Sequence, residues 1–266
     1  MENYKKFLVL ANDKADLKNF AKRQETIFQL ENAKSEAFNV TGPTSHLYIT
    51  TSNKLFELYF EDEDYEEALD IAKELFEIVK TTTNIKIKSE AIVNLGLAYL
   101  RNGNITSARK IANKYTFNED NPQYPQYCLF RSNLSAVYKD KEQELLYLNN
   151  AYNYAIKNKH SNPEIGNTLL AIALYYERNG YLKKAYDSYL QIFNKASEMS
   201  LSLSDEERFS FLIRLSNLSI KNNNEALALD LLNKSKIAMN EKFKPNHPLI
   251  KVVDKTLSQL NKNKES

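Results

Sequence analysis

A pattern that returns about every forty residues constrains the fold of this chain more than any other feature of its sequence. Around Tyr99, large residues precede at i−7 and i−4, glycines lie at i−3 and i+4, and alanines follow at i+9 and i+13. The same offsets from Tyr176 and Tyr59 align without an insertion or deletion. Apolar spacings of three and four residues are typical of α-helices, so each unit predicts two helices joined by a short turn.

Two weaker copies complete the array. Around Tyr138, Leu134 and Ser135 fit the pattern, but Tyr147 stands where the other repeats have a small residue. Around Ser219 the flanking residues fit, although the tyrosine itself is missing. The expected reference positions of the five repeats are therefore 59, 99, 138, 176 and 219.

The helix-breaking residues favour an all-α fold. The chain has five glycines and six prolines, and most of them lie between the periodic segments. Strand-type alternation is nowhere sustained, so we expect no sheet. The small residue at i−3, which is Gly96 in the clearest repeat, is expected to let the two helices of one pair approach closely.

The pattern of Ile92, Leu95, Gly96, Tyr99 and Ala108 resembles the tetratricopeptide repeat. That resemblance implies a right-handed superhelical solenoid of antiparallel helix pairs, with about five repeats plus terminal helices. The repeats here are longer than the standard length of about 34 residues. The segments TGPTSHLY and KPNHPLIK are also similar to linkers in the longer repeats of kinesin light chains and related proteins.

The repeats define the expected domain organisation. An N-terminal helical pair is expected in residues 1–41, packed on the solenoid. The repeats occupy 42–248, divided approximately into 42–84, 85–121, 122–162, 163–202 and 203–248. Residues 249–266 are expected to form a capping helix with a frayed tail, because the end of a solenoid needs a covering element.

Composition excludes several classes of partner. Thirty-six basic residues nearly balance 34 acidic ones, so no overall field favours nucleic acid. No stretch is long and apolar enough to insert into a membrane, and the first residues do not resemble a signal peptide. Cys128 has no second cysteine to pair with, which suits a reducing compartment. We expect a cytoplasmic protein whose oligomeric state the sequence does not indicate.

No set of residues predicts a reaction. His46, His160 and His247 are far apart in the sequence, and we expect turn residues there rather than general bases or metal ligands. The acidic run at 61–67 lacks the alternating oxygens and central glycine of a calcium loop. The tyrosines at the reference positions are expected in the core and not as stacking platforms for bases. We expect no enzyme, cofactor or metal.

The expected binding surface lies beside the packing positions of each first helix. Positions i−6, i−5, i−2 and i+2 share one stripe by helical geometry, and in tetratricopeptide proteins that stripe lines the concave groove. Apolar residues and amides are mixed there, whereas an exposed surface with no binding function would carry mainly charged residues. The candidate protein- or peptide-binding residues are Asn53, Lys54, Asn94, Leu97, Arg101, Asn133, Ala136, Leu174, Arg178, Arg214 and Asn217.

Asparagine suits a peptide-binding stripe because its amide offers both a donor and an acceptor to a ligand backbone. Asn94 and Asn133 correspond to asparagines that hold peptide backbones in several members of the resembled family. An alternative explanation is that asparagine is merely abundant, as the segments NKNK and KNNN show.

Two functions follow from these expectations. The first is a non-catalytic adaptor or scaffold that binds a partner protein or short peptide in the concave groove. The alternative is a cytoplasmic signalling-peptide receptor or regulator, related to bacterial quorum-sensing receptors but lacking a DNA-binding domain. Such receptors usually carry an N-terminal output domain, and residues 1–41 are too short for one, which favours the adaptor.

Overall fold

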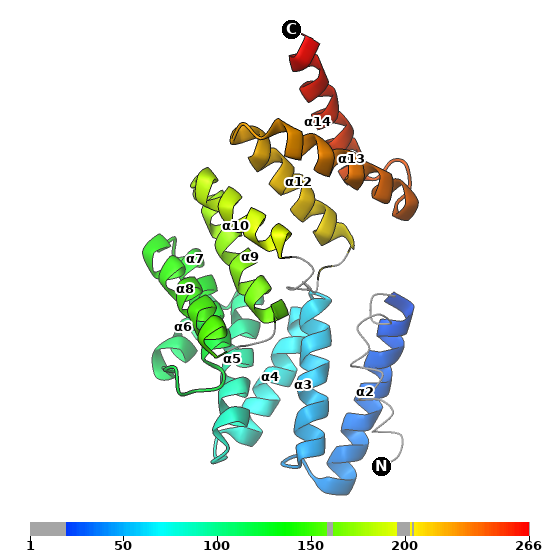
Figure 1. Cartoon of the computed structure of the whole chain (residues 1–266). Helices are drawn as coiled ribbons and strands as arrows, with labels where there is room; N and C mark the ends of the chain where they lie inside the picture. Colours follow the sequence, from blue (N-terminus) through cyan, green and yellow to red (C-terminus); the bar gives the residue numbers. More distant parts are fainter. Residues whose placement is uncertain (1–19, 159–161, 196–202, 204, 266) are drawn as a thin grey trace. The chain divides into compact units, whose positions relative to one another are not determined.

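The computed structural model describes residues 20–158, 162–195, 203 and 205–265, and every regular element in these ranges is an α-helix (Figure 1). The all-α prediction is confirmed. The twelve helices of the described ranges are α2 (Phe20–Thr41), α3 (His46–Glu61), α4 (Tyr65–Val79), α5 (Ile85–Arg101), α6 (Ile105–Lys114), α7 (Tyr124–Val137), α8 (Lys141–Lys157), α9 (Asn162–Arg178), α10 (Leu182–Asn194), α12 (Asp205–Lys221), α13 (Glu225–Lys242) and α14 (Pro248–Glu265).

The helices group into two compact units, Met1–Ala151 and Tyr152–Ser266. Unit 1 holds α2 to α7 and most of α8, whereas unit 2 holds the end of α8 and α9 to α14. Of the expected N-terminal helical pair, α2 is the second helix, and residues 1–19 lie outside the described part of the chain. At the other end, α14 continues to Glu265, so the segment expected to be frayed is helical.

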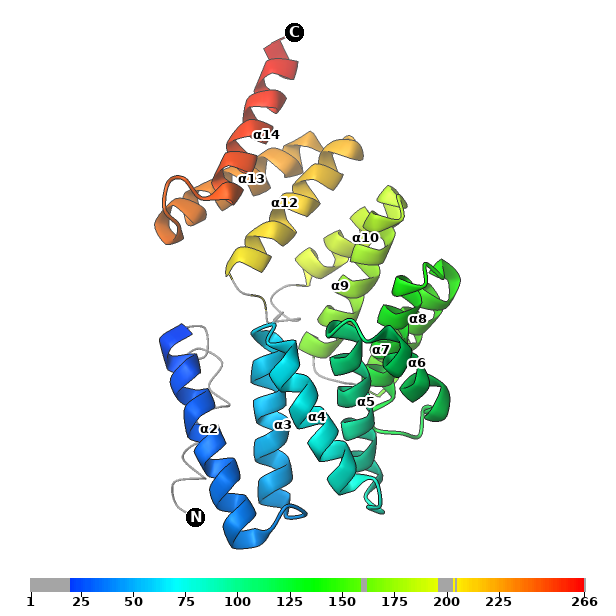
Figure 2. The same ribbon diagram turned by 180° about the vertical axis from the view of Figure 1, so that it is seen from behind.

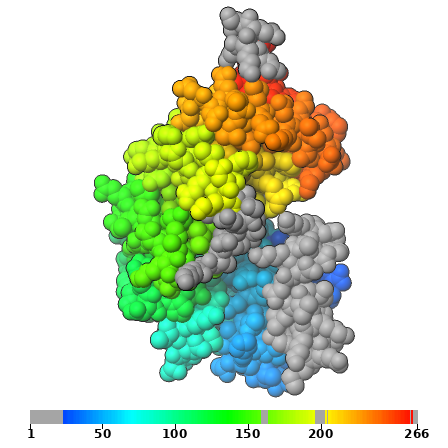
Figure 3. Space-filling view, viewed as in Figure 1, coloured from blue at the N-terminus to red at the C-terminus, as the bar shows by residue number. Residues whose placement is uncertain are grey.

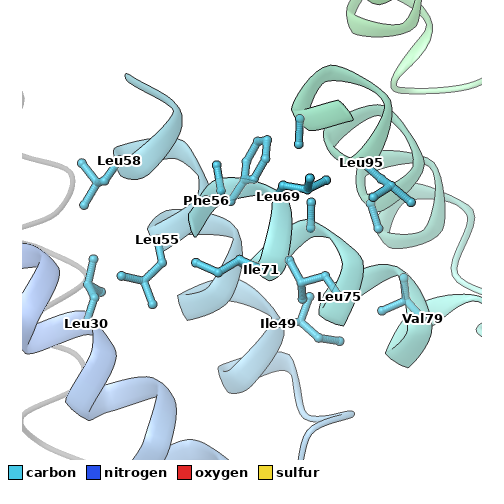
Figure 4. Close-up of a cluster of buried hydrophobic side chains, with 14 of the residues drawn as sticks. Leu30, Ile49, Leu55, Phe56, Leu58, Leu69, Ile71, Leu75, Val79 and Leu95 are labelled. Atoms are coloured by element: carbon cyan, nitrogen blue, oxygen red, sulfur yellow. The ribbon is translucent and has the colours of Figure 1, made fainter. Parts of the chain in front are cut away.

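In unit 1, helices α2 to α7 each pack against the next in sequence order (Figure 2). The core between α2 and α5 is built from leucine, isoleucine and alanine side chains on facing helix stripes. Leu30 of α2 lies beside Leu55 of α3, and Leu75 of α4 lies between α3 and Leu95 of α5 (Figure 4). Each leucine buried in this way stabilises the fold by roughly 1.5 to 3 kcal/mol relative to an exposed one.

Unit 2 is built by the same rule. Helix α9 packs on α10, α10 on α12, α12 on α13, and α13 on α14. In the space-filling view these helices follow one another from yellow-green to orange-red in sequence order (Figure 3). Tyr189 and Leu215 are fully buried in the first part of this core, and Leu232 and Val253 in the second. Contacts between successive helices therefore supply the core of both units.

The five helix pairs share one three-residue turn. Its second residue lies in the left-handed region, with φ between 58° and 78°. These residues are Glu63, Gly103, Lys139, Gly180 and Asn223. In each turn, the N–H of the third residue donates to a carbonyl five residues earlier, over 2.8 to 2.9 Å. This Schellman geometry ends the first helix, and the third residue then stands at the N-terminal boundary of the second helix.

The turn locates each repeat independently of the sequence pattern. Its carbonyl acceptors are Tyr59, Tyr99, Ser135, Tyr176 and Ser219. Four of these are the expected reference residues, but the third repeat is displaced by three residues, from Tyr138 to Ser135. The steps between repeats are therefore 40, 36, 41 and 43 residues. The displacement was not visible in the sequence because a lysine, Lys139, holds the left-handed position where glycine or asparagine is usual.

This displacement overturns the expected core role of Tyr138. Helix α7 ends at Val137, so Tyr138 lies in the turn and its side chain is 50% exposed. Its ring lies against the Arg109 guanidinium, 5.4 Å from the ring centroid. At the corrected i+9 position the third repeat has Glu144, which is buried, where the other four repeats have alanine.

The role of Gly96 also differs from the expectation. A Cβ atom at this position would lie 2.6 Å from Cζ of Phe130, which is on α7. The glycine therefore makes room for a ring from the first helix of the next repeat, and not for α6, its partner in the pair. Phe130 is almost completely buried against this backbone. The close approach joins two repeats of unit 1.

Substitution of Gly96 tests this contact. Gly96→Ala is expected to lower the free energy of unfolding by about 1 to 3 kcal/mol, because the buried ring must shift. Phe130→Leu shortens the ring side chain, so the double variant is expected to lose less than the sum of the two single variants. Urea unfolding followed by circular dichroism measures all three, and strictly additive losses would contradict the contact.

Substitution of Lys139 tests the displaced turn. A non-glycine residue in the left-handed region costs roughly 1 to 2 kcal/mol, and glycine offsets part of this through its own entropy loss. Lys139→Gly is therefore expected to raise the free energy of unfolding by about 0.5 to 1 kcal/mol. Gly103→Ala is the matched control and is expected to destabilise, although a Cβ there meets no atom within 4 Å. A Lys139→Gly variant less stable than the parent would place the turn elsewhere.

Candidate functional site

The predicted residues of α3 and α5 form a polar stripe in unit 1. The Asn94 side-chain N–H donates to the side-chain oxygen Oδ1 of Asn53 over 3.5 Å, so the structure brings these two side-chain amides together. Lys54 forms an ion pair with Glu57 on the same helix, over 2.8 Å. Asn53, Lys54 and Asn94 are all half-buried. Residues of the stripe thus provide part of one another's hydrogen bonds and ion pairs.

A second carboxylate makes this stripe electrostatically unfavourable. Burial raises the pKa of Glu90 on α5, the Glu57 carboxylate raises it further, and Lys86 lowers it. Two acidic groups of neighbouring first helices therefore repel each other across the stripe. Glu90 lies nine residues before the reference tyrosine, outside the stripe positions expected from the sequence.

The corrected register changes the position of Asn133 within its repeat. With Ser135 as the reference, Asn133 occupies i−2 and the i−5 position belongs to Phe130. The prediction that Asn94 and Asn133 are equivalent is therefore wrong. Ala136 moves to i+1, out of the stripe positions.

The other two unit 1 candidates do not join the polar stripe. Leu97 is half-buried against the core that joins α5 and α7, so its side chain contributes to packing. Arg101 is exposed in the last turn of α5. Neither residue is therefore part of the hydrogen-bonded amide pair at Asn53 and Asn94.

Unit 2 contains a pocket of about 440 Å³ that brings together two of the predicted residues, Leu174 and Arg214. Helices α9, α10 and α12 and the start of α14 supply its walls. Most of its lining is apolar. The lining residues are Leu170, Leu174, Tyr189, Leu203, Glu206, Glu207, Ser210, Phe211, Arg214, His247, Pro248 and Leu249. The volume lies within the range of roughly 300 to 1,000 Å³ typical of ligand sites.

One face of α12 provides the length of this pocket. Glu207, Ser210, Phe211 and Arg214 line it, at spacings of three and four residues. These spacings place the four side chains on one side of the helix. The face changes from acidic to apolar to basic along two turns.

A hydrogen-bond network holds Arg214 in place. Its Nη1 donates to Oε2 of Glu177 on α9 over 2.9 Å, and the Tyr189 hydroxyl donates to the same oxygen over 3.0 Å. Burial raises the pKa of Tyr189, and the Glu177 carboxylate adds to this shift, so the phenol stays protonated as a donor. Three helices therefore orient one guanidinium at the pocket.

His247 forms the opposite end of the pocket and caps α14. Its Nδ1 accepts from the Leu249 N–H over 3.4 Å, and its Nε2 lies 3.0 Å from Oε1 of Glu206. The ring stacks on Phe243 with centroids 4.1 Å apart. Because Nδ1 is an acceptor, Nε2 carries the hydrogen that is donated to Glu206. The expected turn role therefore describes His247, whereas His160 lies outside the described residues.

Solved structures share this architecture. BtubC from P. vanneervenii gives a TM-score of 0.62 at 14% identity, over 86% of this chain and 95% of that chain. A tetratricopeptide repeat protein from Parabacteroides merdae gives 0.54 at 17% identity, over 93% and 84%. A putative kinesin light chain with TPR-like repeats from Podosopora anserina gives 0.50 at 16% identity, over 74% and 98%. This chain has a tetratricopeptide-repeat fold.

No protein-family model matches the sequence, and no curated protein does. At identities of 14 to 17% the structural likeness shows the tetratricopeptide-repeat fold alone. Within the described ranges, no group of three or more histidine, cysteine or acidic side chains could hold a metal ion. The same ranges contain no helix long and apolar enough to cross a membrane.

The tetratricopeptide geometry explains which residues sequence reasoning missed. Leu170 lies at i−6 from Tyr176, on the stripe that was considered, but it was not selected. Phe211 lies one turn beyond that stripe on α12, and Leu249 belongs to α14. Arg178 and Asn217 are exposed and do not line the pocket. On α12 the pocket therefore extends toward the start of the helix, past the stripe positions expected from the sequence.

The raised pKa of Glu90 predicts a pH-dependent effect. The folded protein holds this proton more tightly than the unfolded chain, so Glu90 lowers stability as pH rises from its ordinary carboxyl value of 4.5. Glu90→Gln is expected to raise the free energy of unfolding at pH 7 and to change it little well below pH 4.5. Glu57→Gln, which removes the repulsion but also the ion pair with Lys54, should give a smaller gain. Urea unfolding at both pH values measures these free energies. An equal gain for Glu90→Gln at both pH values would contradict the raised pKa of Glu90.

Proposed function

We propose that this chain is a non-catalytic helical-repeat module that binds a segment of a partner protein. The pocket of unit 2 carries this proposal, since it places an apolar cavity on the first helices α9 and α12 and at the start of α14. In this arrangement an apolar side chain of the partner enters the cavity and polar groups at its ends position the backbone. Such concave apolar sites with a few oriented polar groups are typical of binding sites.

The lining favours binding over chemistry. Leu170, Leu174 and Phe211 offer apolar contact, and burying a leucine-sized partner side chain there contributes roughly 1.5 to 3 kcal/mol. The charged groups are already engaged: Arg214 with Glu177, and Glu206 with His247. Such pre-oriented groups lose little freedom when a ligand binds, which supports a recognition role.

The polar stripe of unit 1 is proposed as a second contact surface for the partner. Asn53 and Asn94 bond to each other through one donor and one acceptor, so each amide keeps further hydrogen-bonding capacity.

The fully buried Cys128 suits a reducing compartment, which supports a cytoplasmic location.

Leu174→Glu tests the proposed function. The side chain is 38% exposed, so the substitution is expected to leave the thermal midpoint nearly unchanged while placing a charge in the pocket. Partner proteins captured from the native host and identified by mass spectrometry should be lost. Calorimetric titration of a captured partner should then show at least about tenfold weaker binding, which corresponds to roughly 1.4 kcal/mol.

Ile237→Glu is the matched control. Ile237 is 65% exposed on α13 and does not line the pocket. This variant should capture the same proteins as the parent chain, with the same affinity. Equal capture and affinity for Leu174→Glu would show that partners use another surface.

A further inference from the structure

The two ends of the unit 2 pocket differ in charge. Glu206 and Glu207 lie in the first turn of α12 and line one end, whereas the neighbouring Asp205 forms ion pairs with Lys242 and Arg208. Arg214 lines the other end. Its Nη1 donates to Glu177, which also accepts from the Tyr189 hydroxyl, and the two α9 residues that line the pocket, Leu170 and Leu174, are uncharged. A ligand in the pocket thus meets carboxylates at one end and a guanidinium at the other.

The bond to Glu177 engages Nη1 of Arg214. A guanidinium has five N–H donors in a planar fork, so a second acceptor can bind along another edge. The Arg214 side chain is 48% exposed, which leaves it accessible to a ligand carboxylate. Glu177 therefore positions the arginine without occupying it.

The separation of the ends limits the ligand. Glu207 and Arg214 are seven residues apart on α12, which is about 10 Å along the helix axis. Phe211 lies between them on α12 and lines the same cavity as Leu170 and Leu174 of α9. The pocket thus presents an acidic end, an apolar middle and a basic end within about 10 Å.

The size of the cavity favours an extended ligand. A sphere of 440 Å³ is about 9 Å across, whereas a helix with its side chains is about 10 to 12 Å wide. In an extended segment, alternate side chains point the same way, and five residues span about 12 to 14 Å. Flexible lysine and glutamate side chains can adjust to the remaining difference.

We propose that this pocket selects an extended protein segment in which a basic, a large apolar and an acidic residue occupy alternate positions. The proposal rests on the peptide-binding function inferred above and names the chemistry of its ligand. The basic residue meets Glu206 and Glu207, the apolar residue fills the space beside Phe211, and the acidic residue meets Arg214. Opposite charges at the two ends exclude segments that carry one sign throughout.

Synthetic peptides test the pattern directly. The probe is the acetylated and amidated heptapeptide Ser-Lys-Ser-Leu-Ser-Glu-Ser, compared with versions carrying two lysines or two glutamates and with one carrying serine for leucine. The full-length chain is expected to bind the first peptide about tenfold more tightly than each of the other three, as calorimetry or NMR titration measures. Blocked termini ensure that only side-chain charge differs.

Charge-reversing variants test which end of the pocket contacts the basic residue of the peptide and which contacts the acidic residue. Arg214→Glu is expected to prefer the two-lysine peptide, and Glu207→Lys is expected to prefer the two-glutamate peptide. Because Arg214→Glu places a carboxylate near Glu177, thermal melting verifies that it folds. If it does not, Arg214→Gln replaces it and should bind the lysine–glutamate and two-lysine peptides equally.

The outcomes separate this proposal from the proposed function. Equal affinity for all charge patterns, or an unchanged order in the Arg214 and Glu207 variants, overturns the proposed selectivity. The same holds if no peptide binds while Leu174→Glu still abolishes partner capture, and in that case the binding function stands. Unchanged peptide affinity in Leu174→Glu shows that the peptides bind elsewhere and also overturns the proposal.

Discussion

The three-residue turn that reverses the chain within each helix pair is the constraint on which the rest of this structure depends. A residue in the left-handed region ends the first helix, and the next residue starts the second, so the geometry leaves no freedom in where the pair folds back. Once the turn is placed, helical periodicity decides which side chains face the core and which face the ligand. The turn therefore sets the position of every functional side chain in its repeat.

The third repeat shows how strongly the position of the turn affects the side chains around it. Its turn is built on Lys139, three residues earlier than the sequence pattern indicates, and this moves Tyr138 out of the core and brings Phe130 against the backbone of Gly96. The same displacement removes the apparent match between Asn94 and Asn133. A shift of three residues is nearly one helical turn, so most apolar residues still face inward and the error leaves little trace in the hydrophobic pattern.

The pocket of unit 2 arises from the same geometry. The first helices α9 and α12 each present an apolar stripe beside their packing positions, and the capped start of α14 closes one end. The buried Tyr189 hydroxyl and Glu177 orient Arg214, so a charge at the cavity depends on hydrogen bonds from two other helices. The proposed selectivity thus rests partly on Glu177, which does not line the pocket.

The sequence by itself determined the all-α fold, the pairing of helices and four of the five turn positions, because helical periodicity and short turns are local properties of the chain. Repeat periodicity also singled out Leu174 and Arg214 beside the packing stripe, and both line the pocket. Only the tertiary structure decided that Lys139 adopts a left-handed conformation, since surrounding contacts must offset its local cost. Only the tertiary structure could join Leu170, Phe211 and Leu249 in one cavity, because residues far apart in sequence meet through the packing of successive helices, and no local pattern records that contact.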